Sequence, residues 1–87
     1  MITLMYAIYD KKAKMYNKPF FQINDAIATR SATDLVSTPG TDIFNNPQDF
    51  CMFKLGSYDD ELGQLYIDKE MPLLLNFTDL DKRPEIS

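Results

Sequence analysis

One helix-forming segment, residues 24–37, divides the chain and limits its possible folds most strongly. Asn24 suits a helix N-cap because its side chain can accept a hydrogen bond from a free backbone N–H. Asp25 adds negative charge in the first turn, and Pro39 and Gly40 end the helix. Apolar and small residues recur between these signals at helical spacing: Ile27, Ala28, Ser31, Ala32, Leu35 and Val36. The segment therefore predicts one amphipathic helix with a single face to bury.

The chain before this helix is typical of two strands. Residues 1–9 alternate, and both of the resulting faces are largely apolar, which favours a central strand. Residues 10–13 predict a turn, and residues 14–17 a second strand that ends before Pro19, because proline has no N–H to donate. Three apolar residues then lead into the helix, Phe20, Phe21 and Ile23, and we expect Phe20 and Phe21 in the core.

The chain after the helix is again typical of strands. Residues 41–45 predict a loop, followed by one helical turn in which Asn46 is the cap and Pro47 takes the first helical position. Residues 50–57 and 64–67 predict a hairpin whose turn ends at Gly63, a residue suited to left-handed backbone. Residues 72–77 can add a short edge strand.

The order β-β-α-β-β predicts a small α+β domain, in which one main helix packs on one face of an antiparallel sheet of four to five strands. We assign this single domain to residues 1–77 and a polar, flexible C-terminal tail to residues 78–87. Two layers leave the other sheet face open. If that face carries Met5, Tyr9, Met15 or Tyr16, it is a candidate surface for a homodimer.

The composition argues against an enzyme. The chain has no histidine, its three glycines are scattered, and its one cysteine, Cys51, lies in an apolar run where a buried small hydrophobe is expected. The acidic run of residues 59–61 lacks the spacing of a cation site and predicts a solvated turn. We therefore expect no catalytic residues, no metal and no cofactor. No apolar run approaches the length of a membrane span and no secretory signal is evident, so we expect an intracellular protein.

The stretch DKKAKMYNKPFF, residues 10–21, is the candidate functional site. Its side chains include a set suited to single-stranded nucleic acid, because lysines neutralise phosphates and aromatic rings stack on bases: Lys11, Lys12, Lys14, Tyr16 and Lys18. Residues 1–30 hold five cations and two acids, whereas residues 31–87 hold four cations and eleven acids. An acidic protein with one basic edge binds a polyanion weakly, so a merely solvated hairpin edge remains the alternative.

Several pieces of the chain, in their order and spacing, resemble one known family. They are YAIYDKKA (6–13), PF (19–20), NDA (24–26) with Ala28 and Arg30, DLV (34–36), NPQDF (46–50) and LGSYDDELG (55–63). Together they resemble the small nonstructural protein of gokushoviruses, the tailless single-stranded-DNA phages of the Microviridae. The resemblance brings no catalytic motif, and it does not extend to residues 73–87.

The resemblance implies a nonstructural phage protein of the host cytoplasm, absent from the virion. It would assist viral DNA replication at the switch to single-stranded DNA synthesis and packaging. Two modes of action are compatible with that role. The protein can bind single-stranded DNA weakly through the N-terminal hairpin. Alternatively, it can be an adaptor that docks on the replication initiator, host replication proteins or the procapsid without contacting DNA.

Overall fold

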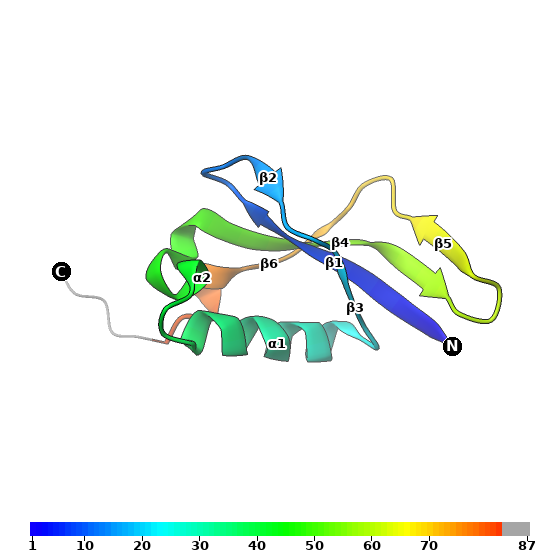
Figure 1. The fold of residues 1–87 in the computed structure, drawn as a ribbon, viewed down its shortest axis with the longest axis horizontal. Helices are drawn as coiled ribbons and strands as arrows, with labels where there is room; N and C mark the ends of the chain where they lie inside the picture. Colours follow the sequence, from blue (N-terminus) through cyan, green and yellow to red (C-terminus); the bar gives the residue numbers. More distant parts are fainter. Residues whose placement is uncertain (83–87) are drawn as a thin grey trace.

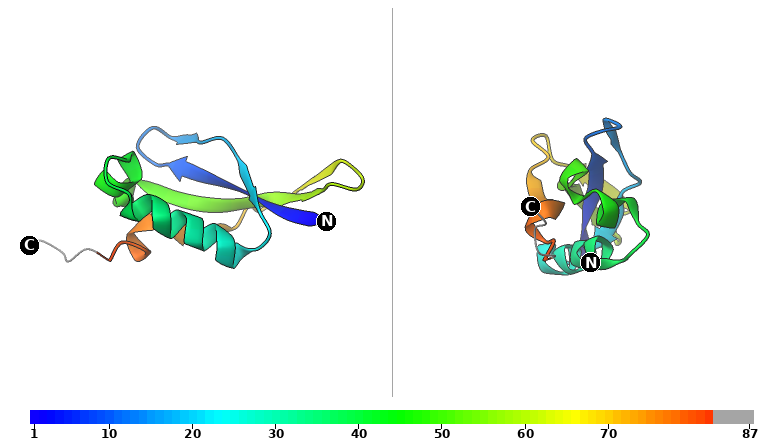
Figure 2. Two further views of the ribbon diagram at one scale, coloured as in Figure 1. Left: turned by 60° about the horizontal axis from the view of Figure 1, so that its bottom comes forward. Right: turned by 90° about the vertical axis from the view of Figure 1, so that its left-hand side faces the viewer.

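The computed structural model describes residues 1–82, which form a two-layer α+β fold (Figure 1). Two long antiparallel strands, β1 (Ile2–Asp10) and β4 (Phe50–Asp59), pair along their whole length at the centre of a six-stranded sheet. The main helix α1 (Asp25–Ser37) lies along one face of that sheet, as the side and end views of Figure 2 show. The predicted fold class is therefore confirmed.

Each edge of the sheet is made of two short strands. Beside β1 lie β2 (Met15–Tyr16) and β3 (Phe20–Gln22), which are separated by the segment that contains Pro19. Beside β4 lie β5 (Gln64–Ile67) and β6 (Leu73–Asn76). The β5–β6 loop leaves and rejoins the sheet at adjacent residues of β4: Asp68 N donates to Leu55 O at 2.8 Å, and Lys54 N donates to Pro72 O at 3.0 Å. Both edges are thus single edge strands interrupted by a loop.

Helix α1 begins and ends where the local signals predicted. The side chain of Asn24 accepts a hydrogen bond from Ile27 N at 2.9 Å, which confirms the N-cap. The core lies between this helix and the sheet. Its buried members are Tyr6, Ile8, Ala28, Ala32, Val36, Ile43, Phe50, Met52 and Phe77.

A buried hydroxyl ties the start of α1 to the sheet. The Tyr6 side chain is fully buried, and its Oη donates to Asp25 Oδ1 at 2.6 Å. Lys54 Nζ lies 3.5 Å from the same carboxylate. Burial, and then the hydrogen bond to Asp25, raise the pKa of Tyr6 far above its ordinary value, because both favour the neutral phenol.

Several local predictions were wrong. Residues 41–45 were expected to be a loop, but Thr41 caps the short helix α2 (Asp42–Asn45) by accepting from Phe44 N. The helical turn that follows, η1 (Pro47–Asp49), has Pro47 at its start as predicted, but the Asn46 side chain makes no cap hydrogen bond. These differences arise because side-chain caps depend on rotamers that a sequence pattern does not show.

The segment before the helix also differs from the prediction. Phe20 packs against the core as predicted, but Phe21 is 43% exposed. The reason is that residues 20–22 form strand β3, so Phe20 and Phe21 point to opposite faces of the sheet. This strand also raises the strand number to six, one more than expected.

The C-terminal part of the described chain is ordered beyond residue 77. The turn η2 (Phe77–Asp79) follows β6, and Leu80 packs against the core. The domain therefore takes in the first residues of the predicted tail, while residues 83–87 of that tail lie outside the described part. No helix within residues 1–82 is long and apolar enough to cross a membrane.

Candidate binding surfaces on the hairpin and the open sheet face

The β1–β2 hairpin holds the predicted nucleic-acid residues, and all five side chains are exposed. Its turn is built around Asp10, whose Oδ1 accepts hydrogen bonds from Lys12 N and Ala13 N, each at 3.0 Å. Lys14 closes the turn with left-handed backbone, at φ 58°. The carboxylate of Asp10 is thus used in shaping the turn.

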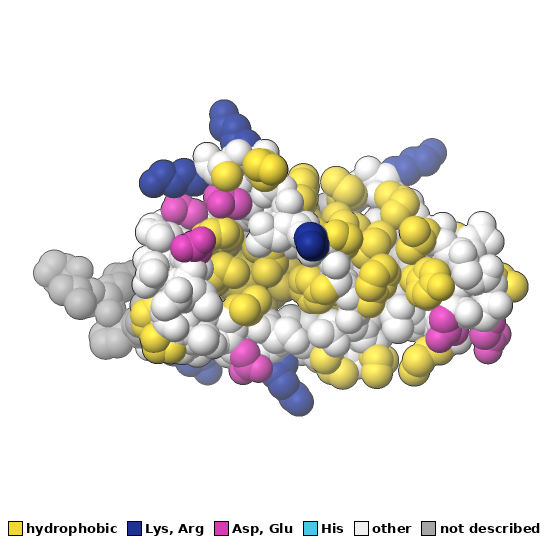
Figure 3. Space-filling model, in the orientation of Figure 1, with side chains coloured by type: hydrophobic (Ala, Val, Ile, Leu, Met, Phe, Trp, Pro, Cys, Tyr) yellow, Lys and Arg dark blue, Asp and Glu magenta, His cyan; other side chains and the backbone are white. Residues whose placement is uncertain are grey.

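The structure corrects one detail of this hairpin. Lys14 was expected to lie in the second strand, but β2 spans only Met15–Tyr16. Because Lys14 has left-handed backbone, strand alternation does not align its side chain with Tyr16. On the face visible in Figure 3, Lys and Arg side chains project singly and do not form a continuous basic patch.

Tyr16 belongs to a cluster of three aromatic rings. Its ring centroid lies 4.7 Å from that of Tyr9 and 5.9 Å from that of Phe53, and the Tyr9 and Phe53 centroids are 6.1 Å apart. Tyr16 is nevertheless 46% exposed. The cluster therefore holds the Tyr16 ring in place while leaving much of it open to a stacking partner.

The positive charge of Lys11 acts on the thiol of Cys51. Burial raises the pKa of the Cys51 thiol, and the positive charge of Lys11 offsets part of that rise. Cys51 pairs with Tyr9 across β1 and β4, so the two side chains share a face. The thiol is buried, as the sequence predicted, and its raised pKa keeps it protonated at neutral pH.

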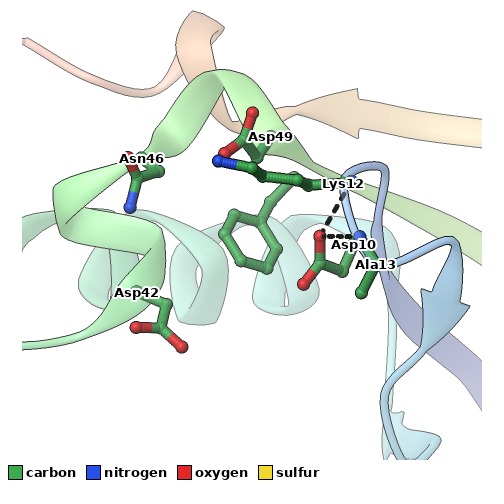
Figure 4. A pocket seen from close by; sticks show the side chains of 7 residues that line it. Asp10, Lys12, Ala13, Asp42, Asn46 and Asp49 are labelled. Carbon is green, nitrogen blue, oxygen red and sulfur yellow. Dashed lines mark hydrogen bonds between the residues drawn. The ribbon is translucent and has the colours of Figure 1, made fainter.

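An acidic cleft lies beside the basic hairpin and weakens its field. The cleft has a volume of about 290 Å³ and is lined by Asp10, Lys12, Ala13, Asp42, Asn46, Asp49 and Phe50. Figure 4 shows three carboxylates around it, those of Asp10, Asp42 and Asp49. Within residues 1–82 no group of three or more His, Cys, Asp or Glu side chains is placed to hold a metal ion. The cleft therefore acts on the hairpin as nearby negative charge.

The sheet face away from α1 is apolar, and we call it the open face. Residues that pair across neighbouring strands point to the same side of a sheet, so the strand register shows which residues lie on the open face. Those that carry an apolar side chain are Met5, Ala7 and Tyr9 of β1, Tyr16, Phe21, Cys51, Phe53 and Tyr58, with Leu65, Ile67 and Leu73 from the edge strands. A ring contact of 5.9 Å between Phe21 and Tyr58 confirms that β3 and β4 present these side chains together.

The edges of the open face are accessible to solvent, whereas Met5, Ala7 and Cys51 on its two central strands are buried within the chain itself. Tyr16, Phe21, Leu65, Ile67 and Leu73 are all exposed, and they lie on four different strands. Met5 and Tyr9 lie on this face as anticipated, whereas Met15 pairs with Asp10 and so points to the other side. The contributions of Phe21, Phe53, Tyr58 and the edge strands could not be predicted, because they depend on the strand register.

A family model described as Phage ORF5 protein matches residues 3–80 of the chain, which is nearly the whole of the described fold. Comparison with curated proteins and comparison with solved structures each gave no match.

Proposed function

The chain belongs to the Phage ORF5 protein family and is a phage accessory protein, and from this premise we propose how it acts. We propose that it is a nonstructural, non-enzymatic protein of a gokushovirus-like phage that works in the host cytoplasm. In this proposal it assists viral DNA replication at the switch to single-stranded DNA synthesis and packaging. It does so by binding single-stranded DNA weakly through the β1–β2 hairpin.

The observation that carries this proposal is the setting of Tyr16. Its ring is held by Tyr9 and Phe53 yet is 46% exposed, and exposed lysines surround it in the chain. Within residues 1–82, Lys11, Lys12, Lys14 and Lys18 have no carboxylate within ion-pair distance. A fixed ring on a hairpin that also carries unpaired ammonium groups suits a base and the phosphates that flank it.

The proposed binding is weak and electrostatic. Four lysine–phosphate contacts give a slope of log K against log salt of about −2.8, so a rise from ~50 to ~200 mM salt lowers the affinity roughly 50-fold. The carboxylates of Asp10, Asp42 and Asp49 beside the hairpin reduce the attraction further. We therefore expect measurable binding at low salt and little at physiological salt unless protein or DNA is locally concentrated.

Fluorescence anisotropy of a labelled oligothymidine tests the proposal. At about 50 mM salt, wild type should bind, and Lys14→Glu/Lys18→Glu should abolish binding. Lys69→Glu/Lys82→Glu is the matched control, because it makes the same change in charge at exposed lysines outside the hairpin. If folded wild type shows no binding at this salt concentration, or if both double variants lose binding equally, DNA recognition by the hairpin is wrong.

A second candidate function is favoured by the open face. An accessory protein that presents exposed apolar side chains on four strands can act as an adaptor on the replication initiator, host replication proteins or the procapsid. Pull-down from infected cells with and without nuclease separates the two functions. Partners that survive nuclease treatment support the adaptor, whereas partners that nuclease releases were bridged by DNA.

A further inference from the structure

The open face carries few of the polar side chains that an exposed sheet surface normally carries: by the register, Thr3 and Asn76 are its polar members. An antiparallel sheet with one solvated face usually alternates apolar-in and polar-out residues. Here β5 places Leu65 and Ile67 on the open face, and both are more than half exposed. Leu73 on β6, at the other half of the same edge, is 50% exposed. Burying this surface requires a partner with a matching apolar face.

We propose that this partner is a second copy of the same chain, packed open face against open face with its strands antiparallel to those of the first. Two sheets pack in this manner at a spacing of about 10 Å with their strands nearly aligned. The resulting homodimer has four layers, with the helix α1 of each copy on the outside.

The hairpins at the two ends of the sheet carry opposite charges, although the carboxylates of Asp42 and Asp49 lie near the basic one, and this difference favours one orientation. Strand β1 begins at Ile2, opposite Asp59, and ends at Asp10, opposite Phe50. The hairpin that follows Asp10 carries Lys11, Lys12 and Lys14. The β4–β5 hairpin at the other end of the sheet carries Asp59, Asp60 and Glu61. The long axis of the sheet therefore runs from a basic hairpin to an acidic hairpin.

A face-to-face dimer has two possible twofold axes in the plane between the sheets. An axis parallel to the strands would place the basic hairpins together and the acidic hairpins together. An axis perpendicular to the strands places each basic hairpin over the acidic hairpin of the partner. Like charges repel and opposite charges attract, so the perpendicular axis is favoured at both ends of an isologous interface.

The acidic hairpin is available for this contact. Asp60 binds the N-terminal ammonium of Met1 at 2.6 Å, and the carboxylate of Glu61 lies 3.8 Å from the same group. Both acidic side chains remain more than half exposed. One ammonium group cannot neutralise all the carboxylates of residues 59–61, so the hairpin keeps a net negative charge.

The dimer and the proposed DNA complex use overlapping surfaces. Tyr16 lies on the open face, and Lys11 and Lys14 belong to the basic hairpin that would meet the partner's acidic hairpin. Self-association and DNA binding should therefore exclude each other. The dimer itself rests only on the open face and the charges at its two ends, so it can be tested independently of the DNA proposal.

Sedimentation equilibrium on the full chain tests the apolar contact. Wild type should approach twice the 10.1 kDa chain mass as its concentration rises. Ile67→Lys should weaken the dimer roughly 100-fold, because it buries an unpaired charge at the interface. Tyr66→Lys is the matched control: it makes the same change at the neighbouring residue, whose side chain points to the other face, and should leave the dimer intact. A wild type that stays at 10.1 kDa up to millimolar concentration overturns the proposal, as does an equal loss in both variants.

Charge reversal tests the orientation. Lys11→Glu/Lys14→Glu makes both ends acidic, and Asp60→Lys/Glu61→Lys makes both ends basic. Each variant alone should dimerise roughly tenfold more weakly than wild type, whereas a 1:1 mixture should recover wild-type association. In a parallel dimer, like-charged hairpins would already face each other in wild type, so neither charge reversal would weaken association. Dimers of both variants as stable as wild type would therefore refute the antiparallel packing. Circular dichroism confirms that each variant is folded.

Discussion

Because of the hydrogen bond between Tyr6 and Asp25, removing the donor and removing the acceptor should lower the free energy of unfolding by different amounts. In Tyr6→Phe the buried donor disappears, and the half-exposed Asp25 carboxylate can bind water, so the free energy of unfolding should fall by about 1 kcal/mol. In Asp25→Ala the fully buried phenol keeps its hydroxyl without an acceptor, which costs about 1–3 kcal/mol. Loss of a carboxylate at the helix start adds ~0.5 kcal/mol, and loss of the Lys54 contact adds ~0.5 kcal/mol or less.

The expected total for Asp25→Ala is therefore about 2–4 kcal/mol, at least twice the effect of Tyr6→Phe. In a Tyr6→Phe background there is no orphaned hydroxyl, so Asp25→Ala should cost only about 1 kcal/mol. Urea denaturation followed by circular dichroism measures all four corners of this double-mutant cycle. Equal effects of the two single substitutions, or strict additivity in the double variant, would refute a buried hydroxyl that depends on Asp25.

Three further predictions concern the fold. Because the raised pKa of Tyr6 lies above the ordinary value of 10.0, the unfolded chain loses this proton first as pH rises. Above pH 10 the free energy of unfolding should therefore fall more steeply in wild type than in Tyr6→Phe, by up to ~1.4 kcal/mol per pH unit. Urea denaturation at several alkaline pH values measures this, and equal slopes of the free energy against pH in the two proteins would contradict it. Gly56→Ala would place a Cβ 1.9 Å from the Tyr66 carbonyl oxygen, so the pairing of β4 with β5 should be lost. Hydrogen exchange measures this, and amides of β5 that stay protected in the variant would argue against the close packing at Gly56. Asn24→Ala removes the cap on Ile27 N and should cost about 1 kcal/mol in urea, whereas Asn24→Asp should cost little.

Local signals accounted for most of the elements. The helix was predictable because its cap, its apolar stripe and its Pro-Gly end all lie within residues 24–40. The positive φ of Gly63 and the strand β5 after it followed from turn chemistry. Strand β3 was missed because its three residues are too few to show a period and because Pro19 and the helix cap lie close on either side.

The open face could not be predicted in full, because it depends on contacts between distant parts of the chain. Phe53 meets Tyr9 and Tyr16 only through the pairing of β1 with β4, more than forty residues away. An irregularity in that pairing between Met5 and Tyr6 also changes which residues of β4 share a face. The lysines of the hairpin were visible in the sequence, but their spacing from the carboxylates of α2 and η1 was not.

An NMR titration tests whether the β1–β2 hairpin is the DNA-binding surface. In ¹H–¹⁵N spectra of the labelled protein at about 50 mM salt, oligothymidine should shift the amides of residues 11–18 together with those of their open-face neighbours Tyr9 and Phe53. The shifts should disappear on addition of salt, as expected for phosphate contacts. No shifts at saturating oligonucleotide, or shifts centred on the acidic hairpin of residues 59–63, would contradict DNA binding by the β1–β2 hairpin.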